Sequence, residues 1–233
     1  MEDLIRFGDI EIQYKKKEIK NIHLSVHPPN GKVTLVVPKE TRLEVAKAYA
    51  ISKLSWIRHQ KKLFLEQTRE NYLKYEDHES HFLWGRRYLL SVNYSDKKSF
   101  VKLDDKKIIL TVKSKSSRKN KEKIVQEWYR SKLHEQIPSL INKWQEKMGV
   151  KVNKYYLQKM KTRWGSCNPI SKNIRLNTEL AKKPKNFLEY VLVHELAHLL
   201  EPTHNENFIN ILNKFYPYWK EARKELNELP IGN

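Results

Sequence analysis

The sequence predicts an α+β protein in which a small β-rich N-terminal region with one long helix precedes a largely helical C-terminal region. Apolar and polar residues alternate over the first forty residues, as they do in half-buried strands. The alternation returns between residues 82 and 112, and segments with helical periodicity follow it. We therefore place a domain boundary between residues 1–117 and residues 118–233.

In the N-terminal region, alternating apolar residues predict three short strands within residues 10–37, at Ile10, Ile12 and Tyr14, at Ile22, Leu24 and Val26, and at Val33, Leu35 and Val37. Thr41 and Glu44 form a capping box, which predicts a helix that begins there and continues toward Glu70. Residues 82–112 then predict a second small group of strands.

The C-terminal region begins with a predicted helix over residues 119–147, which Pro138 is expected to kink and Gly149 to end. Two strands, 154–160 and 173–177, are expected around a turn at 162–171. Residues 186–200 are apolar on most sides of a helix, which predicts a buried helix. Thr203 and Glu206 form a second capping box, which predicts a last helix that runs through Trp219. No internal repeat is evident along the chain.

The composition indicates a folded protein of the reducing interior of a cell. Of 233 residues, 39% are hydrophobic, and the chain contains six Trp, twelve Tyr and seven Phe. The single cysteine, Cys167, excludes an intramolecular disulfide. No signal peptide and no apolar run of about 18 residues is recognisable, so we expect a cytoplasmic protein that does not enter a membrane.

The charge is strongly positive, with 46 Lys and Arg against 27 Asp and Glu and a net charge of +19. Such an excess attracts anionic partners, among them nucleic acid. Residues 97–123 are its most basic segment, and residues 1–150 carry +13 of the total, so we expect the N-terminal part to recruit such a partner. A biased base composition of the genome would explain the lysines equally well.

The predicted buried helix contains the pattern HExxH at residues 194–198. On a helix, residues i and i+4 lie one turn apart on the same face, so His194 and His198 can both bind one metal ion, with Glu195 beside them. Two imidazoles and a carboxylate are costly in an apolar helix unless a hydrogen-bond network or a metal satisfies them. The pattern therefore predicts one Zn²⁺ ion and an activated water.

A third ligand is expected from the segment that follows the motif. His204 lies six residues after His198, in the first turn of the predicted last helix, so a tight turn would bring a third imidazole to the ion. The same spacing occurs in metzincins, but Glu201 occupies the position of their glycine and no methionine follows the motif. Glu221 or Glu225 is the alternative, as in thermolysin-like sites.

The sequence resembles the YgjP-like metallopeptidase family, which is related to SprT-like and Wss-type zinc proteases. The resemblance is closest at residues 163–167 (RWGSC), 174–177 (IRLN) and 190–198 (YVLVHELAH), and at Pro202, His204 and Phe208. It implies a compact zincin core with a small antiparallel sheet beside the active-site helix. It also implies zinc ligands at His194, His198 and His204, and Glu195 as the catalytic base.

These inferences predict a zinc-dependent peptidase in which Glu195 takes a proton from the attacking water. A strand near residues 163–167, or one near Asn177, is expected to pair with an extended peptide, with Arg163, Trp164, Gly165 and Asn177 as substrate-binding residues. Arg163 and Tyr216 are candidates for stabilising the oxyanion. Cys167 is interpreted as a small packing residue rather than an inhibitory zinc ligand.

Two other functions stay open at this point. In the first, the chain is chiefly a nucleic-acid-binding protein, and its peptidase acts on DNA-associated proteins. Its sequence contains no helix-turn-helix, zinc-finger or RNA-binding signature. In the second, the histidines form a zinc-binding module without catalysis, which the presence of Glu195 disfavours.

Overall fold

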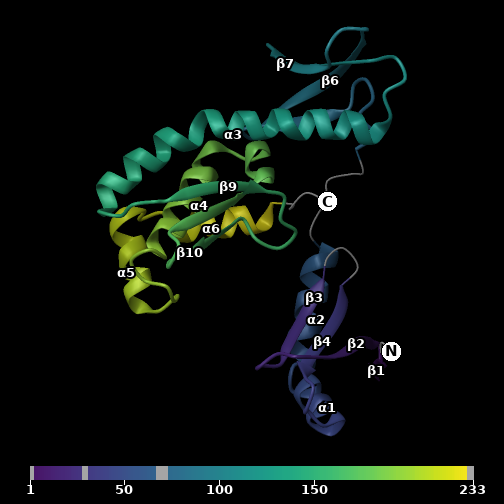
Figure 1. The fold of residues 1–233 in the computed structure, drawn as a ribbon, viewed down its shortest axis with the longest axis vertical. Helices are drawn as coiled ribbons and strands as arrows, with labels where there is room; N and C mark the ends of the chain where they lie inside the picture. The colour runs from purple at the N-terminus through teal and green to yellow at the C-terminus, as the bar shows by residue number, and fades with distance from the viewer. Residues whose placement is uncertain (1–2, 28–30, 67–72, 230–233) are drawn as a thin grey trace. The chain divides into compact units, whose positions relative to one another are not determined.

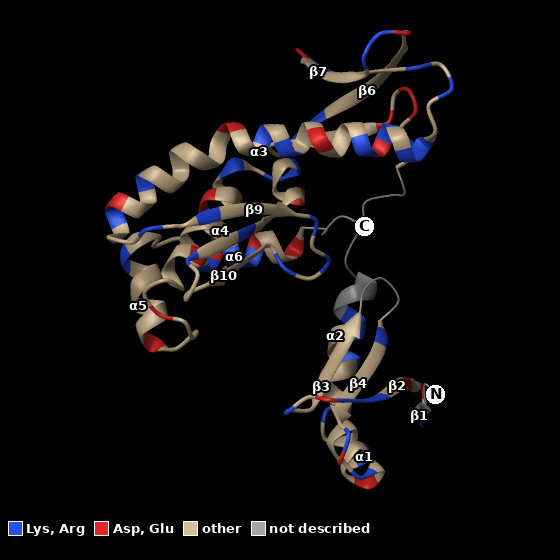
Figure 2. Ribbon diagram, viewed as in Figure 1, with Lys and Arg blue, Asp and Glu red and all other residues tan. Residues whose placement is uncertain are grey.

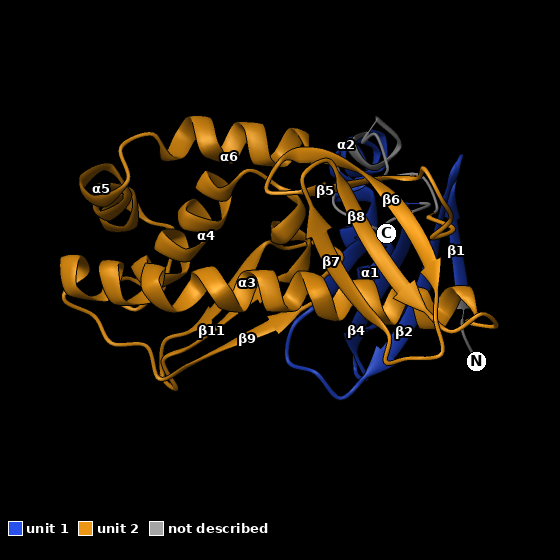
Figure 3. Cartoon of the chain, turned by 90° about the horizontal axis from the view of Figure 1, so that it is seen from above, with its two compact units in different colours: residues 1–69, 233 blue, residues 70–232 orange. Residues whose placement is uncertain are grey.

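A computed structural model describes residues 3–27, 31–66 and 73–229, which form three small sheets and six α-helices (Figure 1). The α+β class is confirmed. The chain divides into two compact units, Met1–Arg69 and Glu70–Gly232 (Figure 3). This division differs from the boundary predicted at 117/118, because residues from Tyr75 onward share a core with the C-terminal helices. No helix of the described ranges is long and apolar enough to cross a membrane.

The first unit is a four-stranded sheet with two helices. The sheet has the order β1 (Asp3–Phe7), β2 (Ile10–Lys17), β4 (Lys32–Pro38), β3 (His23–His27). Strands β2 and β4 are parallel, and the outer pairs are antiparallel. Alternate residues of β2 and β4 are buried, as their sequence predicts, and they form a separate core with apolar side chains of α1 (Leu43–Ser52) and α2 (Leu54–Glu66).

The single helix predicted from Thr41 toward Glu70 is two helices. Lys53 leaves helical geometry, with φ −108° and ψ 4°, and its N–H donates to the carbonyl of Ala50, one residue closer than in an α-helix. A tight turn therefore separates α1 from α2. The last four residues of the predicted helix lie outside the described ranges.

The second unit begins with a sheet that repeats the arrangement of the first. Its order is β5 (Ser80–Leu83), β6 (Arg86–Tyr94), β8 (Lys107–Val112), β7 (Phe100–Asp104), and its pairs are again antiparallel, parallel and antiparallel. The two sheets thus form a structural repeat that the sequence does not display. The buried residues of β6 and β8 continue into the core around the long helix α3 (Arg118–Met148).

Helix α3 has the ends that the sequence predicts. The Ser117 side chain accepts a hydrogen bond from the Asn120 N–H, and Gly149 ends the helix in the left-handed conformation, with φ 66° and ψ 31°. The helix continues through Pro138. Its apolar face is buried from Val125 to Met148, which joins the second sheet and the C-terminal helices in one core.

The third sheet is mixed rather than antiparallel, which corrects the prediction. Its order is β10 (Gly165–Asn168), β11 (Asn173–Asn177), β9 (Lys154–Gln158). Strand β10 pairs antiparallel with β11, but β9 crosses to the far side of β11 and pairs with it in parallel. Strand β10 lies within the predicted turn, because four residues of sequence GSCN carry little strand signal. It is an edge strand.

The remaining helices follow the short 3₁₀ helix η1 (Thr178–Lys182). Helix α4 (Lys185–Ala197) is buried along most of its length, as predicted, although it ends before Leu200. The predicted last helix is in fact α5 (Glu206–Phe215) and α6 (Trp219–Glu228). Pro217 separates them, since proline disfavours helical geometry in the residue before it and lacks an N–H.

Basic residues are distributed over both units (Figure 2). Residues 1–69 carry 14 Lys and Arg against 8 Asp and Glu, and so hold about a third of the net charge of +19. The first compact unit is therefore not where the charge excess is concentrated. The expectation that the basic part before the C-terminal core recruits an anionic partner stays a prediction.

Candidate metal centre

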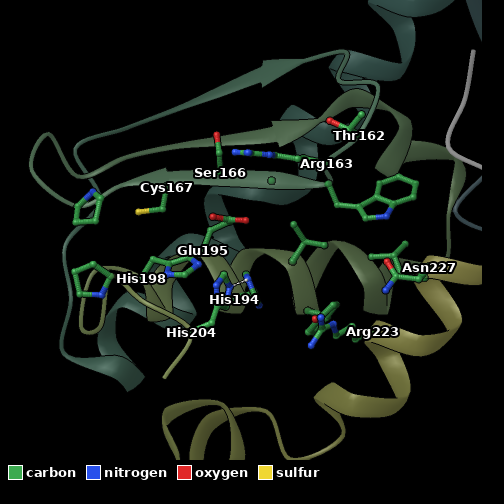
Figure 4. Close-up of a pocket in the computed structure, with 17 residues that line it drawn as sticks. Thr162, Arg163, Ser166, Cys167, His194, Glu195, His198, His204, Arg223 and Asn227 are labelled. Carbon is green, nitrogen blue, oxygen red and sulfur yellow. Dashed lines mark hydrogen bonds between the residues drawn. The ribbon is translucent and has the colours of Figure 1, made fainter. Parts of the chain in front are cut away.

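Three histidines meet at the end of α4. His194 and His198 lie one turn apart on the helix, and His204 comes from the segment between α4 and α5 (Figure 4). One ligand nitrogen of each lies within 4.8 Å of the others, and Nε2 of His204 is 3.1 Å from Nε2 of His194. Glu221 and Glu225, the alternatives for the third ligand, are exposed on α6 and do not belong to this cluster.

The turn that presents His204 is held by Glu201. The Glu201 N–H donates to the carbonyl of Ala197, and its carboxylate accepts hydrogen bonds from the N–H and hydroxyl of Thr203. These bonds lower the pKa of Glu201. Its carbonyl oxygen lies 3.2 Å from Nδ1 of His198, which leaves Nε2 of that ring for a metal. Glu201 therefore stabilises the turn that brings the third histidine back to α4.

The second predicted capping box is wrong. Thr203 bonds to Glu201 and not to Glu206, and the N-cap of α5 is Asn205, whose side chain accepts a hydrogen bond from the Phe208 N–H. His204 thus precedes α5 instead of lying in its first turn. The error does not change the position of the ligand, because the turn itself directs His204 to the site.

The three imidazoles fit a zinc ion. Two ligands at about 2.1 Å from a tetrahedral zinc ion are about 3.4 Å apart, close to the separation of the two Nε2 atoms. Phe208 is buried beneath the cluster, and its ring stacks on His198 with 4.6 Å between centroids. Burial, followed by the neighbouring histidines, lowers the pKa of His194 to about 3. Its ring is therefore neutral at physiological pH, as a metal ligand must be.

Glu195 lies on the other side of the histidines, against strand β10. Its side chain is buried, and its Oε2 has no hydrogen-bond partner among the described residues. Burial raises the pKa of this carboxyl to about 8, although the positive charge of Arg163 opposes the shift. A Cβ atom on Gly165 would lie 2.5 Å from Oε1 of Glu195. Only glycine therefore lets the edge strand approach the carboxylate this closely.

A cavity of about 690 Å³ opens over these residues. Residues 162–167 form one wall, α4 contributes the floor, and α6 supplies the opposite wall (Figure 4). Arg163, Trp164 and Gly165, three of the four predicted substrate-binding residues, line it. Ser166 also lines it, so the free edge of β10 faces the cavity.

The structure does not bring the fourth residue, Asn177, to the cavity. Asn177 is fully buried, and its amide donates hydrogen bonds to the carbonyls of Met160 and Arg163, at 2.8 Å each. Its Oδ1 accepts from the N–H groups of Met160 and Glu179. Asn177 therefore fixes the loop that carries Arg163.

The structure also shows where Tyr216 and Cys167 lie relative to the cavity. The hydroxyl of Tyr216 donates to the carbonyl of Asn186, and its side chain does not line the cavity, so it is poorly placed to stabilise an oxyanion. Cys167 lines the cavity and is half-buried. Burial, with a smaller contribution from Glu195, raises the pKa of its thiol to about 11, which keeps the thiol protonated near neutral pH.

Sequence reasoning missed the wall that α6 contributes. Arg223, Leu226 and Asn227 line the cavity from this helix. Their spacing places them on one side of a helix, which is the only signal that the sequence offers. That signal becomes informative only once α6 is known to fold back across α4.

The chain was compared with family models, curated proteins and solved structures. The family model for the YgjP-like metallopeptidase domain matches residues 20–229. No curated protein matches the chain. Among solved structures, the metallopeptidase zymogen of Pyrococcus abyssi abylysin is 21% identical with a TM-score of 0.36, over 38% of this chain and 90% of that one. The zymogen of Methanocaldococcus jannaschii jannalysin is 22% identical with a TM-score of 0.34, over 39% and 92%.

Proposed function

The chain belongs to the YgjP-like metallopeptidase family, and from this premise we propose that it is a zinc-dependent peptidase. His194, His198 and His204 would hold the ion, and Glu195 would be the general base. The observation that carries the proposal is the position of Glu195, a buried carboxylate beside three clustered imidazoles, whose Oε2 accepts no hydrogen bond from the described part of the chain. Membership of a peptidase family also implies protein or peptide substrates.

The donor set supports zinc as the metal. Three neutral imidazoles with one open position are a common catalytic zinc site, whereas magnesium and calcium prefer oxygen ligands. When bound, the ion would supply Lewis acidity and a water of lowered pKa. Phe208 and the turn at Glu201 orient the ligands from below and from the side.

Glu195 would move the proton. Burial raises the pKa of this carboxyl in the absence of metal, and a bound dication nearby would lower it, which favours the carboxylate form that a general base needs. Its unpartnered Oε2 can accept the proton of the attacking water and later donate it to the leaving amine. The positive charge of Arg163 favours the ionised carboxylate and so lowers the pKa of Glu195, against the effect of burial.

An extended peptide would bind along the free edge of β10 by adding a strand to the sheet. Arg163, Trp164 and Gly165 would contact it directly, and Asn177 would act by fixing the loop before them. Gly165 is then central for two reasons. It lies in the strand that would pair with the peptide, and it permits the approach of Glu195.

The proposal is tested with purified full-length protein loaded with zinc, using casein as substrate. Glu195→Gln should keep its zinc and lose activity by at least about 100-fold, whereas Glu206→Gln, at an exposed position of α5, should keep both its zinc and its activity. His204→Ala should lose bound zinc, and His59→Ala, an exposed histidine of α2, should retain it. Casein cleavage that survives Glu195→Gln would contradict the role of the carboxylate. The histidines would then bind zinc without Glu195 taking part in the cleavage.

Binding of an anionic partner such as nucleic acid is a separate proposal. Seven exposed lysines on and beside β7 and β8 support it, namely Lys97, Lys98, Lys102, Lys106, Lys107, Lys113 and Lys115. Affinity for duplex DNA should fall steeply between low and physiological salt if these charges bind phosphates. A flat salt dependence would contradict the proposal.

A further inference from the structure

The cavity over the histidines has an unbalanced charge. Arg163 and Arg223 line it, and Glu195 is its only acidic lining residue among those described. The three histidines contribute no negative charge, so a bound dication would keep its full charge. The cavity would therefore attract an anionic group. The positions of the two arginines determine where in the cavity that group binds.

Arg163 acts on the catalytic carboxylate. It precedes β10, and its charge lowers the pKa of Glu195 against the effect of burial. In Figure 4 its side chain extends along the strand, on the same side as Ser166. This arginine thus lies along β10, on the other side of the strand from Glu195, and acts on the carboxylate through its charge.

Arg223 lies on the opposite wall, with its guanidinium available. It lines the cavity together with His194 and Tyr190 of α4. Burial raises the pKa of Tyr190, and the positive charge of Arg223 opposes that rise. It is exposed, and no described residue forms an ion pair or hydrogen bond with it. The acidic residues Glu225 and Glu228 of the same helix line a different pocket, beside Phe82 and Pro184. Helix α6 therefore presents Arg223 to the cavity, whereas Glu225 and Glu228 face the other pocket.

The direction of β10 determines which part of a substrate meets Arg223. Figure 4 shows Arg223 and Asn227 toward the Thr162 end of the wall, and Cys167 and His198 toward the other end. A peptide that pairs antiparallel with β10 runs from the Cys167 end toward the Thr162 end. Its residues after the scissile bond then lie on the side of Arg223.

We propose that Arg223 is a specificity-determining residue, which binds a substrate carboxylate on the C-terminal side of the scissile bond. This inference rests on the proposed peptidase function and narrows its substrates to peptides with a negative charge at that position. The carboxylate can belong to an acidic side chain or to the free C-terminus of a short peptide. Arginine suits both sources, because its planar fork matches a carboxylate with two hydrogen bonds.

The test compares three quenched fluorescent peptides that share one neutral core. One has glutamate two residues after the scissile bond and an amidated C-terminus, one is neutral with a free C-terminal carboxylate, and one is neutral and amidated. The enzymes are the zinc-loaded wild type, Arg223→Gln, Arg223→Lys, and Lys224→Gln as the control for loss of a charge on exposed α6. Zinc content and circular dichroism verify that each variant folds.

The wild type should cleave at least one carboxylate-bearing peptide about tenfold better than the neutral amide, in kcat/KM. Arg223→Gln should remove that preference, lowering kcat/KM for the favoured carboxylate peptide about tenfold more than for the neutral amide. Arg223→Lys should restore part of the preference, and Lys224→Gln should keep all of it. The peptide whose advantage depends on Arg223 identifies the source of the carboxylate. A uniform loss on all three peptides, or no preference in the wild type, would overturn the inference.

Binding gives a second readout that does not need turnover. In the zinc-loaded Glu195→Gln protein, fluorescence anisotropy should show tighter binding of the favoured carboxylate peptide than of the neutral amide, and Arg223→Gln in the same background should abolish the difference. If the wild type cleaves no peptide but this difference persists, the proposed peptidase function fails and the assignment of Arg223 stands. Equal binding of all three peptides contradicts the assignment whether or not cleavage occurs.

Discussion

The two four-stranded sheets have the same strand order and the same pairing directions, yet they pack in different surroundings. Each opens with a hairpin that turns at a glycine of positive φ, Gly8 at 59° and Gly85 at 78°. A Cβ atom on Gly8 would meet nothing within 4 Å, whereas one on Gly85 would lie 2.7 Å from Cγ of Pro184, the N-cap of α4. One hairpin is thus an open turn, and the other packs against the start of the helix that carries His194 and His198.

Hydrogen bonds reinforce this difference. The N–H of Trp84 donates to the carbonyl of Ala181 at 2.8 Å, and that of Gly85 to the carbonyl of Lys182 at 3.1 Å. The hydroxyl of Tyr129 on α3 donates to the carbonyl of Phe82. The second hairpin is therefore fastened to η1 and α3, directly before α4. One strand arrangement thus serves in the first unit as a self-contained sheet and in the second as support for the helix that carries His194 and His198.

The largest expected difference between the two units comes from truncating one core side chain in each. Ile12→Ala and Ile108→Ala each remove a fully buried side chain, and each should reduce the free energy of unfolding by about 2–5 kcal/mol. Because the cores are separate, only Ile108→Ala should lower the urea concentration at which zinc is released. Equal shifts in zinc release for both variants would contradict the division into two units.

The next largest effect is expected from Gly165→Ala, which changes the strand beside Glu195. The added methyl group would overlap the Glu195 carboxylate and displace it, so kcat/KM should fall by about 100-fold or more with zinc content unchanged. Ser166→Ala, one residue along the same strand, is the matched control and should retain most activity. Loss of zinc in Gly165→Ala would show that the fold, rather than the position of Glu195, is disturbed.

The two hairpin glycines allow a direct test of the comparison. Gly8→Ala should cost about 1 kcal/mol, the usual penalty of a left-handed conformation for alanine. Gly85→Ala should cost about 1–3 kcal/mol more, because its methyl group also overlaps the Pro184 ring. Chemical denaturation of both variants measures the difference. Similar losses of unfolding free energy would mean that the second hairpin shifts to accept the added methyl group and does not support α4.

The smallest expected effect is a pH dependence in the second unit. The Glu195 carboxyl ionises near pH 4.3 when unfolded and at about 8 when folded, so the folded state holds a proton that the unfolded state has lost. After zinc is removed with a chelator, stability should therefore fall as pH rises from 6.5 to 8, by up to about 1.4 kcal/mol per pH unit. Glu195→Gln should flatten this slope. An unchanged slope would assign it to another group.

Sequence reasoning succeeded where the chemistry is local. The spacing of His194, Glu195 and His198 fixes their relation on one helix, and the apolar residues around them predict burial. The position of His204 followed from a turn only six residues long, although bonds from Thr203 to Glu201 and the N-cap Asn205, rather than a capping box of Thr203 and Glu206, build that turn.

The features that sequence reasoning missed depend on tertiary contacts. Strand β10 is too short to show a pattern, and it forms because β11 supplies its partner. Asn177 lies in the right segment for a binding residue, yet its amide is used within the fold. Arg223 reaches the cavity only because Pro217 ends α5 and α6 turns back over α4. None of these contacts leaves a local periodicity in the sequence.

In the proposed zinc site, the turn from Leu199 to Asn205 would couple metal uptake to folding. His194 and His198 belong to a buried helix, but His204 is exposed and belongs to the segment that leads into α5. A ligand that binds only the closed turn stabilises it by mass action, in proportion to the logarithm of its free concentration. Cellular zinc would thereby set how often this segment opens, and backbone amides between α4 and α5 should exchange their hydrogens more slowly as zinc concentration rises.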